Sequence, residues 1–235
     1  MSNEVKIYST LTQPLATEAD ELSADMFESA IPTQHTQEFF SDEERGIYVG
    51  LWDTTSMRET AGPYPMEEFM VVLEGKADIA LATGSMRQVQ TDEGFVIPHG
   101  TDCQWQQQGY LKKLFVIVDN PTICPSNAQA TDIQIFGPNY NDVPYVNEAK
   151  SFSVYSWSEF THAKRNNLRA SLAAVYCQQG CAIYQSAAST SDAAQNQCQS
   201  AQVMLIEQFN SENLNFLSHS SGYVVLINIS DNGQS

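Results

Sequence analysis

The feature of this chain that most constrains its fold is a succession of short apolar runs separated by turn residues. The separators contain glycine or proline, as in Gly62-Pro63, Glu74-Gly75 and Pro98–Gly100. Runs of this length suit strands and are too short for long helices. Short strands at close, regular spacing are typical of an all-β sandwich or barrel. In the first half the runs are Ile47–Trp52, Phe69–Leu73, Ala77–Ala82, Phe95–Ile97 and Leu114–Val118.

The second half of the chain repeats this succession. A constant offset of 105 residues places Trp157 on Trp52, Val154 on Val49 and Gly180 on Gly75, which favours a duplicated domain. Residues 121–145 between the halves contain four prolines and few apolar runs, so we expect a linker there. The predicted domains are therefore 1–120 and 146–235. Strands in the second are expected at Phe152–Trp157, Leu172–Cys177, Cys181–Tyr184, Val203–Ile206 and Tyr223–Ile229.

Two segments depart from the strand pattern. Thr17 precedes acidic residues and is expected to cap a short N-terminal helix from Glu18 to Ser29, with Leu22 and Met26 on one face. The segment Gln185–Gln202 is rich in serine, alanine and glutamine, and this composition predicts a flexible loop.

The charge balance excludes several partners. The chain has 28 Asp and Glu against 11 Lys and Arg, a formal charge of −17 that repels nucleic-acid phosphates and anionic membranes. Its first ten residues lack the basic-then-apolar order of a signal peptide, and no apolar run has the length of a bilayer span. We therefore expect a cytoplasmic protein with neither a nucleic-acid nor a membrane partner. Its five cysteines form no Cys-x-x-Cys pair and are expected to be free thiols.

Residues 46–118, about a third of the chain, carry a resemblance to a known family. The matching residues are Gly50–Trp52, Tyr64–Phe69, Val72–Gly75, Phe95–Gly100, Trp105 and Lys113–Ile117. In order and spacing this segment resembles the cupin superfamily, and most of all the cupins grouped with ureidoglycine aminohydrolase and the ethanolamine-utilisation cupin. The resemblance implies tandem double-stranded β-helix (jelly-roll) barrels and a homodimer.

The metal motif of that superfamily is largely missing here. Glu68 stands six intervening residues before Gly75 and occupies the glutamate position. The first two histidine positions fall on Gly62 and Tyr64, or on Ala61 and Pro63, and the third falls on Cys103. First-row metals need several imidazole, carboxylate or thiolate donors at once. We therefore expect no resident cofactor. Glu68 and Cys103 are weak candidate ligands, which at most would hold a divalent transition metal weakly.

The resemblance also predicts a ligand pocket inside the first barrel, formed by Tyr64, Glu68, Cys103 and Trp105. Cys103 and Trp105 are two residues apart, so they share one face of a strand. The direction of Lys113 is not determined by the sequence. In the second barrel the offset places Ala173 at the position of Glu68. The region equivalent to Cys103–Trp105 contains Leu214, Phe216 and Leu217, and this barrel is expected to be filled with apolar side chains.

Three functions are consistent with these features. The first is a small-molecule-binding cupin without catalysis, which the missing histidines beside a retained Glu68 favour. The second is a metal-dependent bicupin enzyme acting on a small nitrogenous metabolite, which the resemblance favours. The third is a structural or oligomer-forming protein, which the apolar second domain favours. Fold alone does not choose among them, and whether the chain is an enzyme stays open.

Overall fold

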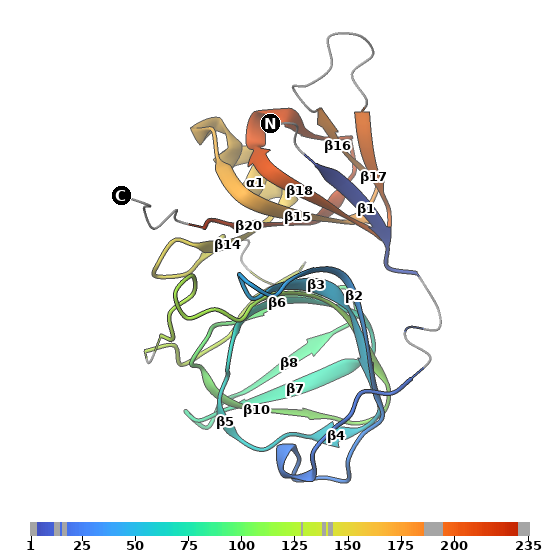
Figure 1. Ribbon diagram of the computed structural model, residues 1–235, viewed down its shortest axis with the longest axis vertical. Coiled ribbons are helices and arrows are strands. Elements are labelled where there is room, and N and C mark those ends of the chain that lie inside the picture. The colour runs from blue at the N-terminus through green and yellow to red at the C-terminus, as the bar shows by residue number, and fades with distance from the viewer. Residues whose placement is uncertain are drawn as a thin grey trace. The chain divides into compact units, whose positions relative to one another are not determined.

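The fold was analysed in a computed structural model that describes residues 4–11, 15, 18–127, 129–137, 140, 143–185 and 195–229. The chain divides into two compact units (Figure 1). One unit spans Thr12–Asn141 and is called the N-terminal barrel below. The other combines Met1–Leu11 with Asp142–Ser235 and is called the C-terminal barrel. Within the described ranges, no helix combines the length and apolar character needed to cross a bilayer.

The N-terminal barrel consists of two antiparallel sheets whose strands form a ring in Figure 1. One sheet has the order β12-β9-β6-β11-β3-β2, and the other has the order β4-β10-β7-β8 with β5 also paired to β10. A core that includes Met70, Phe95, Trp105 and Phe115 packs inside. The strands are β2 Gln34–Asp42, β3 Ile47–Thr54, β4 Met57–Arg58, β5 Gly62–Pro63, β6 Glu67–Glu74, β7 Lys76–Leu81, β8 Met86–Gln90, β9 Gly94–Ile97, β10 Asp102–Gln107, β11 Leu111–Val118 and β12 Gln134–Phe136.

The C-terminal barrel has the same kind of construction. One sheet has the order β1-β18-β15-β20-β14-β13, and a second has the order β17-β16-β19. The helix α1 (Trp157–Ala163) begins where Ser156 accepts a hydrogen bond from the backbone N–H of Glu159, as an N-cap residue does. The strands are β1 Val5–Ser9, β13 Tyr145–Val146, β14 Phe152–Ser156, β15 Arg169–Gln179, β16 Cys181–Gln185, β17 Gln195–Gln199, β18 Gln202–Asn210, β19 Leu214–Phe216 and β20 Ser221–Ile227.

The two barrels share the offset seen in the sequence. β14 begins 105 residues after β3, and β16 begins 105 residues after β7. The turn glycines Gly75 and Gly180 both have positive φ, +90° and +85°. At Gly75 a Cβ would lie 2.3 Å from the carbonyl oxygen of Tyr110, so both the conformation and the space require glycine. This correspondence supports the duplication.

The structure places two segments in other domains than the sequence analysis did. β1 pairs with β18, so residues 5–9 lie in the C-terminal barrel and not in a 1–120 domain. β12 pairs with β9, so residues 134–136 complete the N-terminal barrel and are not part of a linker. Both strands are short edge strands, and their long-range pairing leaves no local signal.

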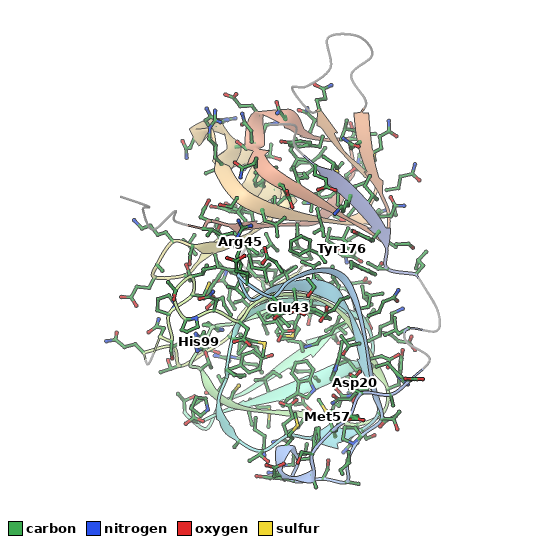
Figure 2. All side chains as sticks on the ribbon, in the orientation of Figure 1. Asp20, Glu43, Arg45, Met57, His99 and Tyr176 are labelled. Atoms are coloured by element: carbon green, nitrogen blue, oxygen red, sulfur yellow. The ribbon has the colours of Figure 1, made fainter. Side chains whose placement is uncertain are left out.

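The predicted N-terminal helix is wrong over its described residues, where only a 3-10 turn, Ala24–Met26, forms. The predicted cap, Thr17, lies outside the described residues. Asp20, labelled in Figure 2, instead bonds to β2. Its backbone N–H donates to the carbonyl of Gln34, and its carboxylate accepts from the backbone N–H and the hydroxyl of Thr36. These contacts favour an extended strap along the barrel.

The predicted loop Gln185–Gln202 contains the strand β17, which pairs with β16. Residues 186–194 of that prediction lie outside the described residues. The predicted strand Phe152–Trp157 ends one residue early because Ser156 caps α1.

Candidate functional site

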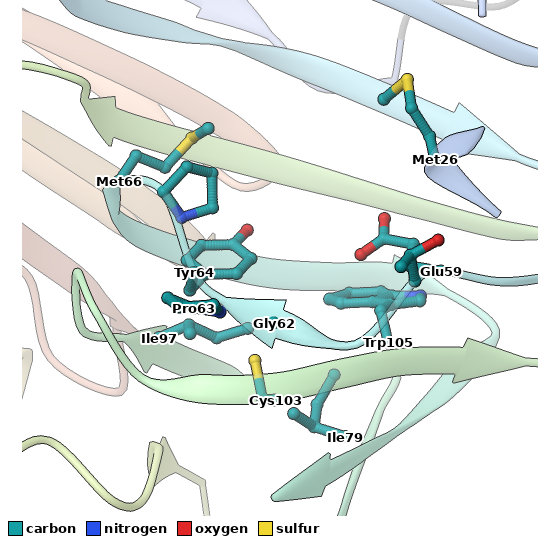
Figure 3. Close-up of a pocket in the computed structure, with 12 residues that line it drawn as sticks. Met26, Glu59, Gly62, Pro63, Tyr64, Met66, Ile79, Ile97, Cys103 and Trp105 are labelled. Atoms are coloured by element: carbon teal, nitrogen blue, oxygen red, sulfur yellow. The ribbon is translucent and has the colours of Figure 1, made fainter. Parts of the chain in front are cut away.

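The interior of the N-terminal barrel contains two adjoining cavities of about 330 and 370 Å³. Glu59, Tyr64 and Met66 line both of them. Figure 3 shows the first cavity, whose floor is formed by side chains from β5, β7, β9 and β10. Its other described lining residues are Met26, Thr60, Gly62, Pro63, Pro65, Ile79, Ile97, Cys103 and Trp105.

A buried ion pair lies beside the second cavity. Lys113 on β11 and Glu68 on β6 both line that cavity, and the Nζ of Lys113 lies 2.9 Å from Oε1 of Glu68. The side chains are 10% and 2% exposed. The hydroxyl of Tyr64 donates to the other carboxylate oxygen of Glu68. Both oxygens of Glu68 are therefore occupied by protein donors.

Two tryptophans hold the lysine in place. The Nζ of Lys113 lies 4.7 Å from the ring centroid of Trp52 and 5.1 Å from that of Trp105, within the range of cation–π attraction. The two indoles meet edge to face with their centroids 6.2 Å apart. Lys113 Nζ also lies 3.0 Å from Sδ of Met70. An ammonium fixed by a carboxylate and two indoles has one preferred position, so the polar end of the pocket is preorganised.

Glu59, between β4 and β5, is the other carboxylate of the interior. Its backbone is fixed to β10, because its N–H donates to the carbonyl of Trp105 and its carbonyl accepts from the side-chain amide of Gln104. Its carboxylate lies beside Trp105 in Figure 3 and forms no hydrogen bond or ion pair with the described residues. Burial raises the pKa of Glu59 to about 7, an effect that Lys113 opposes and Glu68 reinforces. Near neutral pH both the protonated and the ionised form of Glu59 are therefore populated.

The thiol and the phenol of the pocket are both neutral. Burial, followed by the charges of Glu59 and Asp102, raises the pKa of Cys103 to about 12. Burial, followed by the charge of Glu68, raises the pKa of Tyr64 well above its usual value. Neither group therefore offers a preformed anionic donor to a metal ion near neutral pH.

A transition metal of the kind that cupins hold does not fit this donor set. The residues at the family's histidine positions supply no imidazole, and Glu68 is already paired with Lys113. In the described part of the chain, no cluster of three or more His, Cys, Asp or Glu side chains has an arrangement that suits a metal ion.

The four residues that the sequence predicted for the pocket do come together. Tyr64, Cys103 and Trp105 line the first cavity, and Glu68 lines the second, with Tyr64 common to both. The sequence analysis missed Glu59 and left the direction of Lys113 open. One available signal was that Lys113 alternates with Phe115 and Ile117 on β11, which places all three on the inward face. Glu59 lies in an irregular segment between two-residue strands, where no periodicity exists.

The equivalent positions of the C-terminal barrel are apolar. Ala173 and Leu214 belong to its core, and Phe216 packs against that core. Leu217 differs from the expectation, because it is about half exposed and fills no interior. The described core residues Cys177 and Cys198 are free thiols buried among these apolar side chains.

Comparisons with known proteins identify the fold. No family model matches the chain, and no curated protein matches it in sequence. A protein of unknown function of the DUF861 family from Pseudomonas syringae pv. tomato superposes with a TM-score of 0.57 at 14% identity, over 94% of this chain and 97% of that one. The Ylba protein of E. coli, also of the DUF861 family, gives a TM-score of 0.57 at 8% identity, over 95% and 90%.

A cupin 2 conserved barrel domain protein from Leptotrichia buccalis gives a TM-score of 0.45 at 10% identity, over 91% of this chain and 99% of that one. At these identities the likeness of the two DUF861 proteins shows the fold alone. Together with the two observed barrels, it confirms the predicted all-β tandem cupin fold.

Proposed function

We propose that this chain is a small-molecule-binding cupin protein whose pocket is the interior of the N-terminal barrel. The observation that carries the proposal is the set Lys113, Glu68 and Tyr64, which is buried beside a cavity that the protein does not fill. A buried ion pair contributes little to stability compared with well-packed apolar residues. Such a pair next to open space is therefore better explained by recognition than by packing.

The size and lining of the interior support the same conclusion. Cavities of about 330 and 370 Å³ are at the lower end of the range of about 300–1,000 Å³ typical of small-molecule sites. Such sites combine apolar and aromatic walls with a few fixed polar groups. Here Trp52, Trp105 and Ile79 supply the walls, and Glu59 and Glu68 supply polar groups from two sides.

A second candidate is an enzyme that transfers protons. The specific observation in its favour is Glu59, whose pKa of about 7 suits a general acid or base near neutral pH. The metal-dependent form of this candidate lacks a donor set among the described residues. Binding ranks first because Glu68 is paired with Lys113, Tyr64 and Cys103 are neutral, and the remaining lining carboxylates apart from Glu59 are exposed to solvent.

The test uses the three tryptophans of the chain as reporters. Two of them, Trp52 and Trp105, border the cavities, and Trp157 lies in the C-terminal barrel. A set of small neutral, cationic and anionic aromatic compounds is titrated into ¹⁵N-labelled protein, and the indole N–H signals are followed. We expect bound compounds to shift the signals of Trp52 and Trp105 and to leave that of Trp157 unchanged.

Gly62 offers a cavity-filling variant with a matched control. It pairs directly with Cys103, so a side chain at Gly62 points to the same inward face, and a Cβ there meets nothing within 4 Å. Gly62→Leu should abolish the shifts, whereas Gly62→Ala should keep them. If the compounds shift only Trp157, or if Gly62→Leu binds as the parent does, the pocket assignment is wrong.

A further inference from the structure

We infer that the ligand of the N-terminal barrel is a small organic cation, and that Glu59 rather than Glu68 receives its charge. This inference rests on the proposed binding function and specifies its ligand class. Three features support it: the charges that line the two cavities, the availability of their carboxylates and the apolar and aromatic character of their walls.

The charges around the interior are strongly unbalanced. Among the described residues that line the two cavities, Lys113 is the single cationic side chain, and no arginine or histidine accompanies it. Four residues with carboxylate side chains line the second cavity together with it: Glu38, Glu59, Glu68 and Asp119. Like charges repel most strongly where solvent screening is weak, so this interior disfavours an anion and attracts a cation.

The carboxylates differ in their availability to a ligand. Glu68 is already engaged, because Lys113 bonds to one of its oxygens and Tyr64 to the other. Glu38 and Asp119 are exposed to solvent, where an ion pair contributes little. Glu59 lines both cavities, its carboxylate forms no hydrogen bond with the described residues, and its side chain is only partly exposed to solvent. It is therefore the group best placed to hold a positive charge.

The walls next to Glu59 indicate an organic cation and not a metal ion. Trp105, Ile79, Ile97 and Met66 provide an apolar and aromatic surface beside the carboxylate. An ammonium or guanidinium group gains cation–π attraction from an indole, and its hydrocarbon part gains from burial. A metal ion gains nothing from such walls and needs more than one free carboxylate.

Binding of a cation should depend on pH because Glu59 must be ionised to receive it. Lys113 and Glu68 act on the pKa of Glu59, and the charge of Glu59 in turn acts on Tyr64 and Cys103. Tyr64 and Cys103 stay neutral near pH 7, and Lys113 and Glu68 are paired with each other. With a pKa of about 7, the ionised fraction of Glu59 rises from about a tenth near pH 6 to about nine tenths near pH 8. Affinity for a cation should therefore increase by roughly tenfold over that range.

The experiment compares three probes of similar size by isothermal titration calorimetry on the full chain: benzylammonium, benzyl alcohol and benzoate. Benzylammonium stays protonated over this pH range, so any pH dependence belongs to the protein. At about pH 8 we expect benzylammonium to bind at least about tenfold more tightly than benzyl alcohol, and benzoate to bind most weakly. Glu59→Gln should remove both the preference and the pH dependence. Glu21→Gln, at an exposed position, is the matched control and should behave as the parent.

Each other outcome overturns a defined part of the reasoning. If benzyl alcohol or benzoate binds as tightly as benzylammonium, the ligand class is wrong and the pocket proposal stands. If Glu59→Gln keeps the preference for the cation, another carboxylate receives the charge. If none of the three probes binds, both the inference and the binding function fail. Should Glu59→Gln fail to fold, Glu59→Asp replaces it. This variant keeps a carboxylate, so its preference for the cation should still depend on pH, and a preference independent of pH would contradict the role of Glu59.

Discussion

Removing the ammonium of Lys113 tests whether the ion pair of the pocket is as desolvated as the structure indicates. In Lys113→Met, Glu68 is left 2% exposed with Tyr64 as its remaining partner. Breaking a buried pair by removing one partner costs about 3–5 kcal/mol, because the other charge stays buried without compensation. The methionine fills part of the space between Trp52 and Trp105, so the cavity contribution is small and the expected loss lies near about 3 kcal/mol.

A double-mutant cycle separates the charge effect from packing. Lys113→Met with Glu68→Gln removes both charges, and we expect it to recover at least about 2 kcal/mol relative to Lys113→Met alone. The free energy of unfolding is measured by urea denaturation, followed by tryptophan fluorescence and circular dichroism. Lys76→Met, at an exposed position of β7, is the control and should change stability by less than about 0.5 kcal/mol. A loss below about 1 kcal/mol in Lys113→Met, or no recovery in the double mutant, would refute the burial of this pair.

Two further predictions follow from the structure. The pKa of Glu59 is raised from 4.5 to about 7 in the folded protein, so the folded state holds the proton more tightly. Its contribution to stability is therefore complete below about pH 4.5 and is lost as the pH rises through about 7. The midpoint of urea denaturation should fall with rising pH over this window, and Glu59→Gln should reduce that fall. An unchanged dependence of the midpoint on pH would contradict the raised pKa. We also propose that the chain forms a homodimer, because exposed sheet edges need covering and closed dimers are the commonest assembly. Light scattering should give twice the chain mass, and a monomer across micromolar concentrations would contradict this.

The sequence predicted the β architecture well because strand signals are local. Runs such as Phe69–Leu73 and Leu114–Val118 lie inside the observed strands β6 and β11. The misses have a common cause, which is pairing with distant residues. β1 pairs with β18, which lies almost the whole length of the chain away in sequence. The backbone N–H of Asp20 bonds to Gln34 of β2 and not to a residue of a helix. No local pattern encodes such contacts.

The candidate site was predictable only as far as its motif reached. Tyr64, Glu68, Cys103 and Trp105 stand at positions that the cupin resemblance marks, and they line the two cavities. Glu59 lies outside every marked position, and its raised pKa arises from burial, an effect that the charge of Lys113 opposes. Sequence reasoning placed Glu68 in the pocket, but a carboxylate at a motif position gives no sign that a lysine on another strand already neutralises it.

The C-terminal barrel lacks both partners of the buried ion pair. In the N-terminal barrel Lys113 of β11 is paired with Val72 of β6. In the C-terminal barrel the residue equivalent to Val72 is Cys177 of β15, which is paired with Gly222 of β20. Gly222 therefore stands at the lysine position and Ala173 at the glutamate position, so both charges are missing together. Losing either charge alone would leave its partner buried and uncompensated, which is the costly state. A Cβ at Gly222 would lie within 2.7 Å of the Trp157 ring, so this indole occupies the space that a lysine would need, and its stacking on Phe216 replaces the polar site with apolar packing.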